Sequence, residues 1–341
     1  YQGETLDGAE ALKRAGLKPV VLSSKEGLIL LSGTTSVTAF ASLAIYDAQT
    51  LSLTADIAGS FTLEVLKGTL MAMDERLMAV RPHPDQINTA ANIRAILKDS
   101  PMLERYRGHR VQDALSIRCM PQLHGPVKKA VKDAQTTLAI ELNSSVDNPL
   151  IFDEEDGGAV ALMGCNADGT YAGMASDNLC IAITDLCKMS NSRIDRLLNS
   201  LVSELPAFLN KNADFNNGLM MIQYASAGLQ GELRILAHPA VVDNLTTCAN
   251  QEDYVNMGYN AAKKAYDSMH LAKYILAAEL ICDGQALDCY EDKRCAKGTQ
   301  AIYDLLRTKV PEMDNDMPLT PYLEAVAQQI IDRAYIRTVE A

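Results

Sequence analysis

An arginine between two glutamines has the chemistry to bind a charged substrate. Arg118 lies in the segment QDALSIRCMPQLHG, between Gln112 and Gln122. A guanidinium can form two parallel hydrogen bonds with a carboxylate, and side-chain amides can orient the bound group. The segment therefore predicts a carboxylate-binding site. A structural alternative stays open, in which Arg118 pairs with Asp113 and stiffens a loop.

Two further segments concentrate Asn, Asp and Glu in turn-rich sequence. The first covers residues 143–148 and continues at 164–169, where Asn and Asp also fit ordinary turns. The second covers residues 248–254 and carries Glu252 and Asp253 directly before a predicted long helix. These acids could simply cap the positive end of that helix, or Glu252 could act as a base or contact a cationic ring.

Long helices must position these clusters, because apolar residues recur at spacings of three and four through most of the chain. The pattern predicts helices over residues 34–54, 61–78, 85–97, 127–142, 174–201, 217–237, 256–283, 299–308 and 321–338. We therefore expect an all-α fold with two regions. Residues 1–31 form a small strand-and-turn region with a short helix over residues 9–15, and residues 32–341 form a helical bundle domain with irregular site loops near 81–125 and 143–170.

The predicted helix over residues 217–237 is apolar on nearly every side. That pattern is typical of a helix inside a larger bundle. One chain of this length offers little material to cover such helices, so we expect subunits to associate.

The composition excludes several classes of protein. Of the 341 residues, 48% are hydrophobic and 22% charged, which is globular rather than disordered composition. The net charge of −12 argues against binding to nucleic acids or anionic membranes. The sequence shows neither a signal peptide nor metal-ligand spacing, and its eight cysteines have the pattern of free thiols. We therefore expect a cytoplasmic protein without a bound metal.

Six segments, in this order, resemble the aromatic amino acid ammonia-lyase family, and within it the histidine ammonia-lyase branch. They are LSSKEGLILLSGTT, QDALSIRCMPQLHG, ELNSSVDNPLIF, ASDNL, NGLMMIQYASA and CANQEDYVNMG. The resemblance runs from Tyr1 to the last helices. It implies a long central helix bundle of the aromatic ammonia-lyase or fumarase-like type, assembled as a homotetramer whose active sites are built from several subunits.

The resemblance also implies an activity, the elimination of ammonia from an aromatic amino acid such as histidine, and roles for single residues. Arg118 would hold the substrate carboxylate, Gln112 would line the pocket of the electrophile, and Glu252 would lie beside the substrate side chain. Asn166 and Gln251 match further substrate-binding positions. The family's electrophile is a methylidene-imidazolone (MIO), made by cyclisation of an internal Ala-Ser-Gly.

The chain departs from the family pattern at the electrophile and at three pocket positions. It contains no Ala-Ser-Gly, so it cannot form MIO by the family's route. Ser32 stands where the family has an asparagine, Leu115 where it has a tyrosine, and Ala167 where it has a phenylalanine. Losing the tyrosine removes a hydroxyl, and losing the phenylalanine empties a large apolar volume.

Two interpretations follow from the matches and the departures. Because the chain resembles the C-terminal two-thirds of a lyase, we expect a carbon–nitrogen lyase subunit that a separate N-terminal polypeptide completes. The alternative is a lyase-fold subunit without ammonia-lyase activity, which acts on another small carboxylate or serves as a structural or regulatory partner. The retained Arg118 and Glu252 favour the first interpretation, and the replaced pocket positions favour the second.

Overall fold

The computed structural model describes residues 1–212 and 215–340. The chain divides into two compact units: a small unit of Tyr1–Thr35 and Ser145–Asp168, and a helical unit of Ser36–Ser144 and Gly169–Ala341. In the described ranges the strands belong to a single hairpin and the rest of the regular structure is helical, so the predicted all-α class is confirmed. No helix in those ranges is long and apolar enough to cross a membrane.

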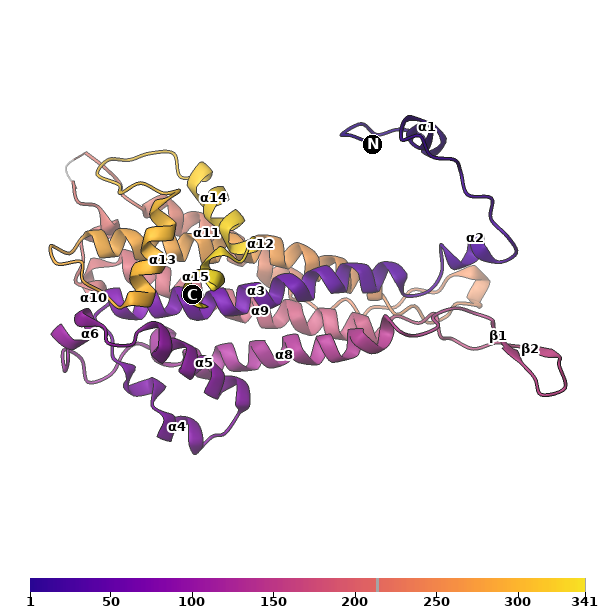
Figure 1. The fold of residues 1–341 in the computed structure, drawn as a ribbon, viewed down its shortest axis with the longest axis horizontal. Helices are drawn as coiled ribbons and strands as arrows, with labels where there is room; N and C mark the ends of the chain where they lie inside the picture. Colours follow the sequence, from indigo (N-terminus) through magenta and orange to yellow (C-terminus); the bar gives the residue numbers. More distant parts are fainter. Residues whose placement is uncertain (213–214, 341) are drawn as a thin grey trace. The chain divides into compact units, whose positions relative to one another are not determined.

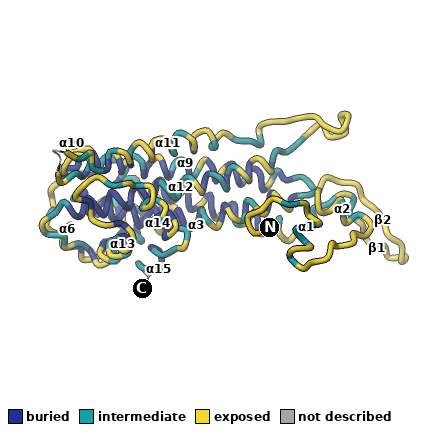
Figure 2. Tube along the Cα trace, turned by 90° about the horizontal axis from the view of Figure 1, so that it is seen from above, coloured by how far each residue is buried: buried dark blue, intermediate teal, exposed yellow. Residues whose placement is uncertain are grey.

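The long helices of the helical unit run side by side (Figure 1). The C-terminal halves of α3 and α12 are buried on almost every side, from Thr50 to Val65 and from Ile275 to Asp288, and they form the centre of the core (Figure 2). The long helices are α3 (Thr35–Val65), α8 (Met120–Glu141), α9 (Thr170–Leu198), α11 (Met220–Leu236) and α12 (Gly258–Asp288).

Shorter helices connect and cover the long ones. Before α8 the chain forms η1 (Leu70–Met73), α4 (Glu75–Ala79), α5 (Pro84–Ile96), α6 (Pro101–Arg105) and α7 (Leu115–Arg118). After α9 it forms α10 (Ser200–Ser203), η2 (Ala207–Leu209), η3 (Cys248–Asn250), α13 (Lys297–Arg307), α14 (Thr320–Ile331) and α15 (Ala334–Glu340).

The structure corrects several predicted helix boundaries; α8, for example, begins at Met120 rather than at residue 127. Residues 34–54 and 61–78 do not form two helices, because α3 continues without a break to Val65. No proline interrupts this stretch, and Gly59 is where α3 approaches Met120: a Cβ at Gly59 would lie 2.3 Å from the Met120 Sδ. Conversely, the helix predicted over 321–338 is broken in two, because Arg333 has a left-handed backbone with φ of 58°.

Helix α11, whose sequence is apolar on nearly every side, does not lie in the interior of this chain. Its buried residues are Ile222, Ser226 and Leu233. Large apolar side chains on its other faces remain exposed, including Tyr224 at 67% and Ile235 at 73%. The centre of the core within this chain is formed by α3 and α12.

The small unit contains the hairpin and two short helices. Strand β1 (Leu150–Asp153) pairs antiparallel with β2 (Ala159–Leu162), with Leu150 opposite Leu162. The strands predicted within residues 1–31 are absent from this fully described segment, whereas the short helix predicted over 9–15 is present as α1 (Gly8–Arg14) and a second short helix forms as α2 (Glu26–Ile29). Val20 and Val21 are 80% and 94% exposed, because no second strand pairs with them.

Candidate functional site

Helix α7 carries Arg118 at its last position. The Arg118 Nη1 donates a hydrogen bond to Gln112 Oε1 at 2.7 Å. The Arg118 Nε is buried and has no hydrogen-bond partner among the described residues. A buried donor without a partner costs free energy, so this guanidinium is suited to donate a hydrogen bond to a ligand acceptor such as a carboxylate. The structure thus brings Arg118 and Gln112 together.

The alternative role of Arg118, an ion pair with Asp113, is wrong. No contact between the two side chains is found among the ion pairs of residues 1–212 and 215–340. The Asp113 Oδ2 instead accepts a hydrogen bond from the Thr69 backbone N–H at 2.8 Å. Burial raises the pKa of Asp113 above its ordinary value, although the Thr69 N–H and nearby arginines oppose the shift. Asp113 therefore fixes the turn after α3 and leaves Arg118 available.

A fully buried ion pair supports α7 from the core. The Arg193 Nη1 donates to the backbone carbonyl of Ser116, in α7, at 3.3 Å. The Arg193 Nε and Nη2 donate to the carboxylate of Glu279, the latter at 3.0 Å. Both side chains of the pair are 0% exposed. Through this pair, α9 and α12 hold the helix that presents Arg118.

Sequence reasoning missed this ion pair. A signal was present, since Glu279 is the lone acid in the apolar run AAELIC of α12. A charge at such a position is almost always paired when it is buried. The pattern cannot name the partner, however, because Arg193 lies on another helix.

Glu252 lies in an exposed loop before α12. Its Oε2 accepts a hydrogen bond from Thr247 Oγ1 at 2.5 Å, and the two residues also form an isolated antiparallel bridge. The capping interpretation of Glu252 and Asp253 is wrong, because α12 begins at Gly258 after the N-cap Met257 and has no acid in its first turn. The adjacent Gln251 is also exposed.

Leu115 and Gln122 lie on either side of Arg118 in the sequence and differ in their exposure to solvent. Leu115, at the first position of α7, is 62% exposed, so it presents apolar surface where a hydroxyl was expected from the family pattern. Gln122 lies in the first turn of α8, and its Oε1 is buried without a hydrogen-bond partner in the described residues.

The remaining predicted residues belong to the small unit. Ser32 and Ala167 are half-buried, and Asn166 is exposed. Gly33 follows Ser32 with φ of 85°, and a Cβ there would lie 2.3 Å from the Val146 carbonyl oxygen, so only glycine fits this position. Ser32 therefore lies directly before the close approach of Gly33 to Val146, within the small unit.

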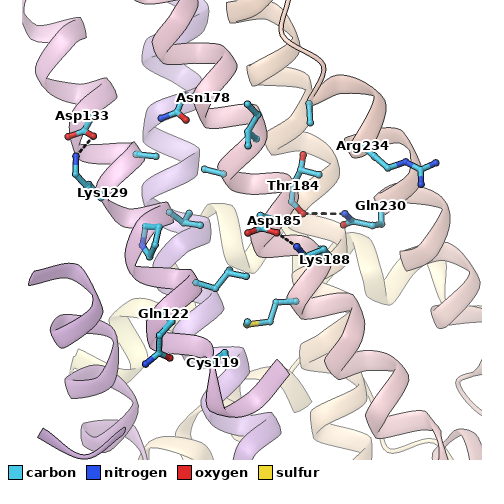
Figure 3. Close-up of a pocket in the computed structure, with 18 residues that line it drawn as sticks. Cys119, Gln122, Lys129, Asp133, Asn178, Thr184, Asp185, Lys188, Gln230 and Arg234 are labelled. Carbon is cyan, nitrogen blue, oxygen red and sulfur yellow. Dashed lines mark hydrogen bonds and ion pairs between the residues drawn. The ribbon is translucent and has the colours of Figure 1, made fainter. Parts of the chain in front are cut away.

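A groove of about 750 Å³ lies between α8, α9 and α11 (Figure 3). The ion pairs Lys129–Asp133 on α8 and Asp185–Lys188 on α9 lie along it. Gln230 on α11 donates to the backbone carbonyl of α9 residue Thr184 at 3.2 Å. The lining is mostly apolar and includes Leu123, Val127, Ala130, Ile181, Ala182 and Met189.

A family model described as "Aromatic amino acid lyase" matches residues 1–308. The chain belongs to this family. Histidine ammonia-lyase of Alkaliphilus oremlandii is 41% identical over 340 residues, which are 100% of this chain and 66% of that protein. The chain therefore spans about two thirds of the length of the curated relatives that it matches.

Solved structures of the aromatic amino acid lyase family have the same fold. Histidine ammonia-lyase from Trypanosoma cruzi superposes with a TM-score of 0.89 at 33% identity, over 98% of this chain and 63% of that one. Tyrosine aminomutase from Streptomyces globisporus gives 0.91 at 29% identity, over 100% and 68%.

The residues of this aromatic amino acid lyase do not fit the formation of MIO. The nearest match to the required tripeptide is Ala175-Ser176, which Asp177 follows. Ser176 is buried within α9, where its hydroxyl donates to the Ala172 carbonyl at 2.7 Å. Asp177 Oδ2 accepts hydrogen bonds from the backbone N–H groups of Ala240 and Val241, at 2.8 and 3.0 Å. This segment is ordinary helix tied to the next connection, and it offers no precursor for the electrophile.

Proposed function

We propose that the chain is a subunit of a carbon–nitrogen lyase that eliminates ammonia from an aromatic amino acid, with histidine as the favoured substrate. The observation that carries the proposal is Arg118, held by Gln112 and by the Arg193–Glu279 pair with donors free for a carboxylate. The names of the histidine ammonia-lyase relatives support the substrate. The electrophile would come from an Ala-Ser-Gly outside these 341 residues, on an N-terminal polypeptide that is separate from this chain or continuous with it.

The proposed roles follow from the chemistry of the side chains. Arg118 binds the substrate carboxylate bidentately and so fixes the amino acid in one orientation. Glu252 accepts the N–H of the substrate ring, and a carboxylate also stabilises an imidazolium. The resemblance to the family assigns substrate binding also to Asn166 and Gln251 and to the replaced positions Ser32, Leu115 and Ala167.

The alternative function is a lyase-fold subunit without ammonia-lyase activity. The replacements Ser32, Leu115 and Ala167 favour it, because they change polar and aromatic groups of the pocket together. Such a subunit would bind another small carboxylate through Arg118 or act as a structural or regulatory partner.

We also propose that the chain forms oligomers through the groove between α8, α9 and α11, with a second copy of the chain as the occupant. Helix α11, which carries exposed apolar residues, lines this groove with Gln230 and Arg234, and both cations and anions lie along it. Such a surface can pair with the same surface of a second copy across a two-fold axis, because a cation of one copy can lie opposite an anion of the other. A homotetramer in the cytoplasm is the proposed form; the eight free thiols agree with a reducing compartment.

The test combines the chain with an N-terminal polypeptide that contains Ala-Ser-Gly and measures conversion of histidine to urocanate. Arg118→Ala should lower kcat/KM by about 100-fold, because a charge-assisted bidentate contact is lost. The matched control is Arg107→Ala, since Arg107 is an exposed arginine that pairs with neighbouring Glu104. Binding of small carboxylates without ammonia release would favour the alternative function, and equal activity of both variants would refute the role of Arg118.

A further inference from the structure

The loop that carries Glu252 is organised around the side chain of Thr247. The Thr247 N–H donates to the Glu252 carbonyl at 2.8 Å, and the Glu252 N–H donates to the Thr247 carbonyl at 3.3 Å. The Thr247 hydroxyl reaches across this bridge to Glu252 Oε2 at 2.5 Å. Backbone and side chain of Glu252 are therefore both held by one residue.

The segment between the two residues has little freedom. Cys248, Ala249 and Asn250 have left-handed backbones, with φ of 48°, 52° and 70°. Three consecutive residues other than glycine in this region store strain, and such a turn persists only where its surroundings fix it. The bridge between Thr247 and Glu252 closes the turn and supplies that restraint.

A second clamp holds the loop on the far side of Glu252. The Asn244 Nδ2 donates to the Asp253 carbonyl at 3.0 Å. The Asn244 Oδ1 accepts from the Val255 N–H at 2.8 Å. The main chain is thus fixed on both sides of Glu252, so the direction of its carboxylate depends on its own side-chain contact.

We propose that Thr247 is a positioning residue, which holds Glu252 Oε2 so that Oε1 is presented to a substrate whose side chain donates an N–H. This inference rests on the proposed function, in which Glu252 contacts the substrate ring. The hydroxyl has one proton to donate and gives it to Oε2. No hydrogen bond from the described residues to Oε1 is found, so that oxygen is left for the ligand.

The consequence is a preference among amino acids. A fixed carboxylate oxygen favours an imidazole, which donates an N–H, over a phenyl ring, which has no such donor. If the carboxylate rotates freely, part of this preference is lost while contacts to the shared amino acid backbone remain. Thr247 therefore affects substrate choice more than turnover in general.

The kinetic test compares three variants in the chain assembled with its Ala-Ser-Gly-bearing polypeptide. Thr247→Val removes the hydroxyl and keeps the branched shape, Thr247→Ser keeps the hydroxyl, and Thr246→Val is the matched control at a neighbouring exposed threonine. Thr247→Val should lower kcat/KM for histidine about tenfold, mainly through KM, and that for phenylalanine less than about twofold. Thr247→Ser and Thr246→Val should stay near the parent value.

Equal losses for both substrates, or a failure of Thr247→Ser to restore the preference, would overturn the proposal. So would a large effect of Thr247→Val in a protein whose histidine turnover is unaffected by Glu252→Gln. Failure of the proposed function looks different, because then Arg118→Ala and Glu252→Gln both leave turnover unchanged.

A crystal structure of Thr247→Val in the 341-residue chain gives a second readout that needs no substrate. The backbone bridge should persist, and the Glu252 carboxylate should occupy more than one rotamer. A single rotamer identical to that of the parent chain would show that the hydroxyl does not hold the carboxylate.

Discussion

At the scale of single residues, the buried histidine of the helical unit couples stability to pH. The His124 Nδ1 lies 2.8 Å from Asp56 Oδ1, and Lys128 pairs with the other oxygen of Asp56. Burial holds the pKa of His124 below its ordinary value of 6.5; Arg193 and Lys128 add to this shift, and Asp56 opposes it. The unfolded chain therefore gains a proton below about pH 6.5 that the folded chain resists, so stability falls as the pH falls.

Replacing His124 by glutamine should flatten this pH dependence. Between pH 6.5 and 5.5 the parent chain should lose up to about 1 kcal/mol through His124, and His124→Gln should lose less, since glutamine does not titrate. Urea unfolding at both pH values measures the difference. The control is His83→Gln, because His83 is exposed. An unchanged slope in His124→Gln would contradict the assignment.

At the scale of elements, a glycine sets how closely α8 packs on α5. A Cβ at Gly125 would lie 2.8 Å from the Gln86 backbone N and 2.9 Å from its Cα. The obstructing atoms belong to the main chain, so a side-chain rotation cannot relieve the contact. The glycine lies inside α8, where glycine is unfavourable, and the packing against α5 explains why it is there.

Gly125→Ala should therefore destabilise the chain by about 1–3 kcal/mol, because α8 must move away from α5. The control is Gly231→Ala in α11, where a Cβ would meet nothing within 4 Å. That change should stabilise the helix by up to about 1 kcal/mol. Thermal or urea unfolding of both variants provides the comparison, and a neutral Gly125→Ala would refute the close approach of the two helices.

At the scale of the whole molecule, the apolar groove between α8, α9 and α11 decides the proposed assembly. Ile181→Glu places a charge on its lining and should reduce the mass of the particle, because a buried carboxylate is unfavourable without a partner. Light scattering coupled to size-exclusion chromatography measures that mass. Val80→Glu is the control at an exposed apolar residue that does not line the groove. If Ile181→Glu keeps the parent mass, the second copy does not bind there.

Much of the helical architecture could be predicted from the sequence, because the spacing of apolar residues reports a helix locally. The helices over 85–97 and 217–237 correspond closely to α5 and α11. The wrong predictions concern the positions at which helices end or break. Helix α3 continues through Gly59, which packs against Met120, and the predicted helix over 321–338 breaks at the left-handed backbone of Arg333.

The sequence by itself determined the all-α class, the family, the absence of the Ala-Ser-Gly and the candidates Arg118, Gln112 and Glu252, because each is a matter of residue type, order and periodicity. Only the tertiary structure decided which groups hold those candidates. It joined Arg118 to Gln112 rather than to Asp113, and Glu252 to Thr247 rather than to the start of α12. Hydrogen bonds and buried ion pairs join residues that can be far apart along the chain, so their partners become known only when the chain is folded.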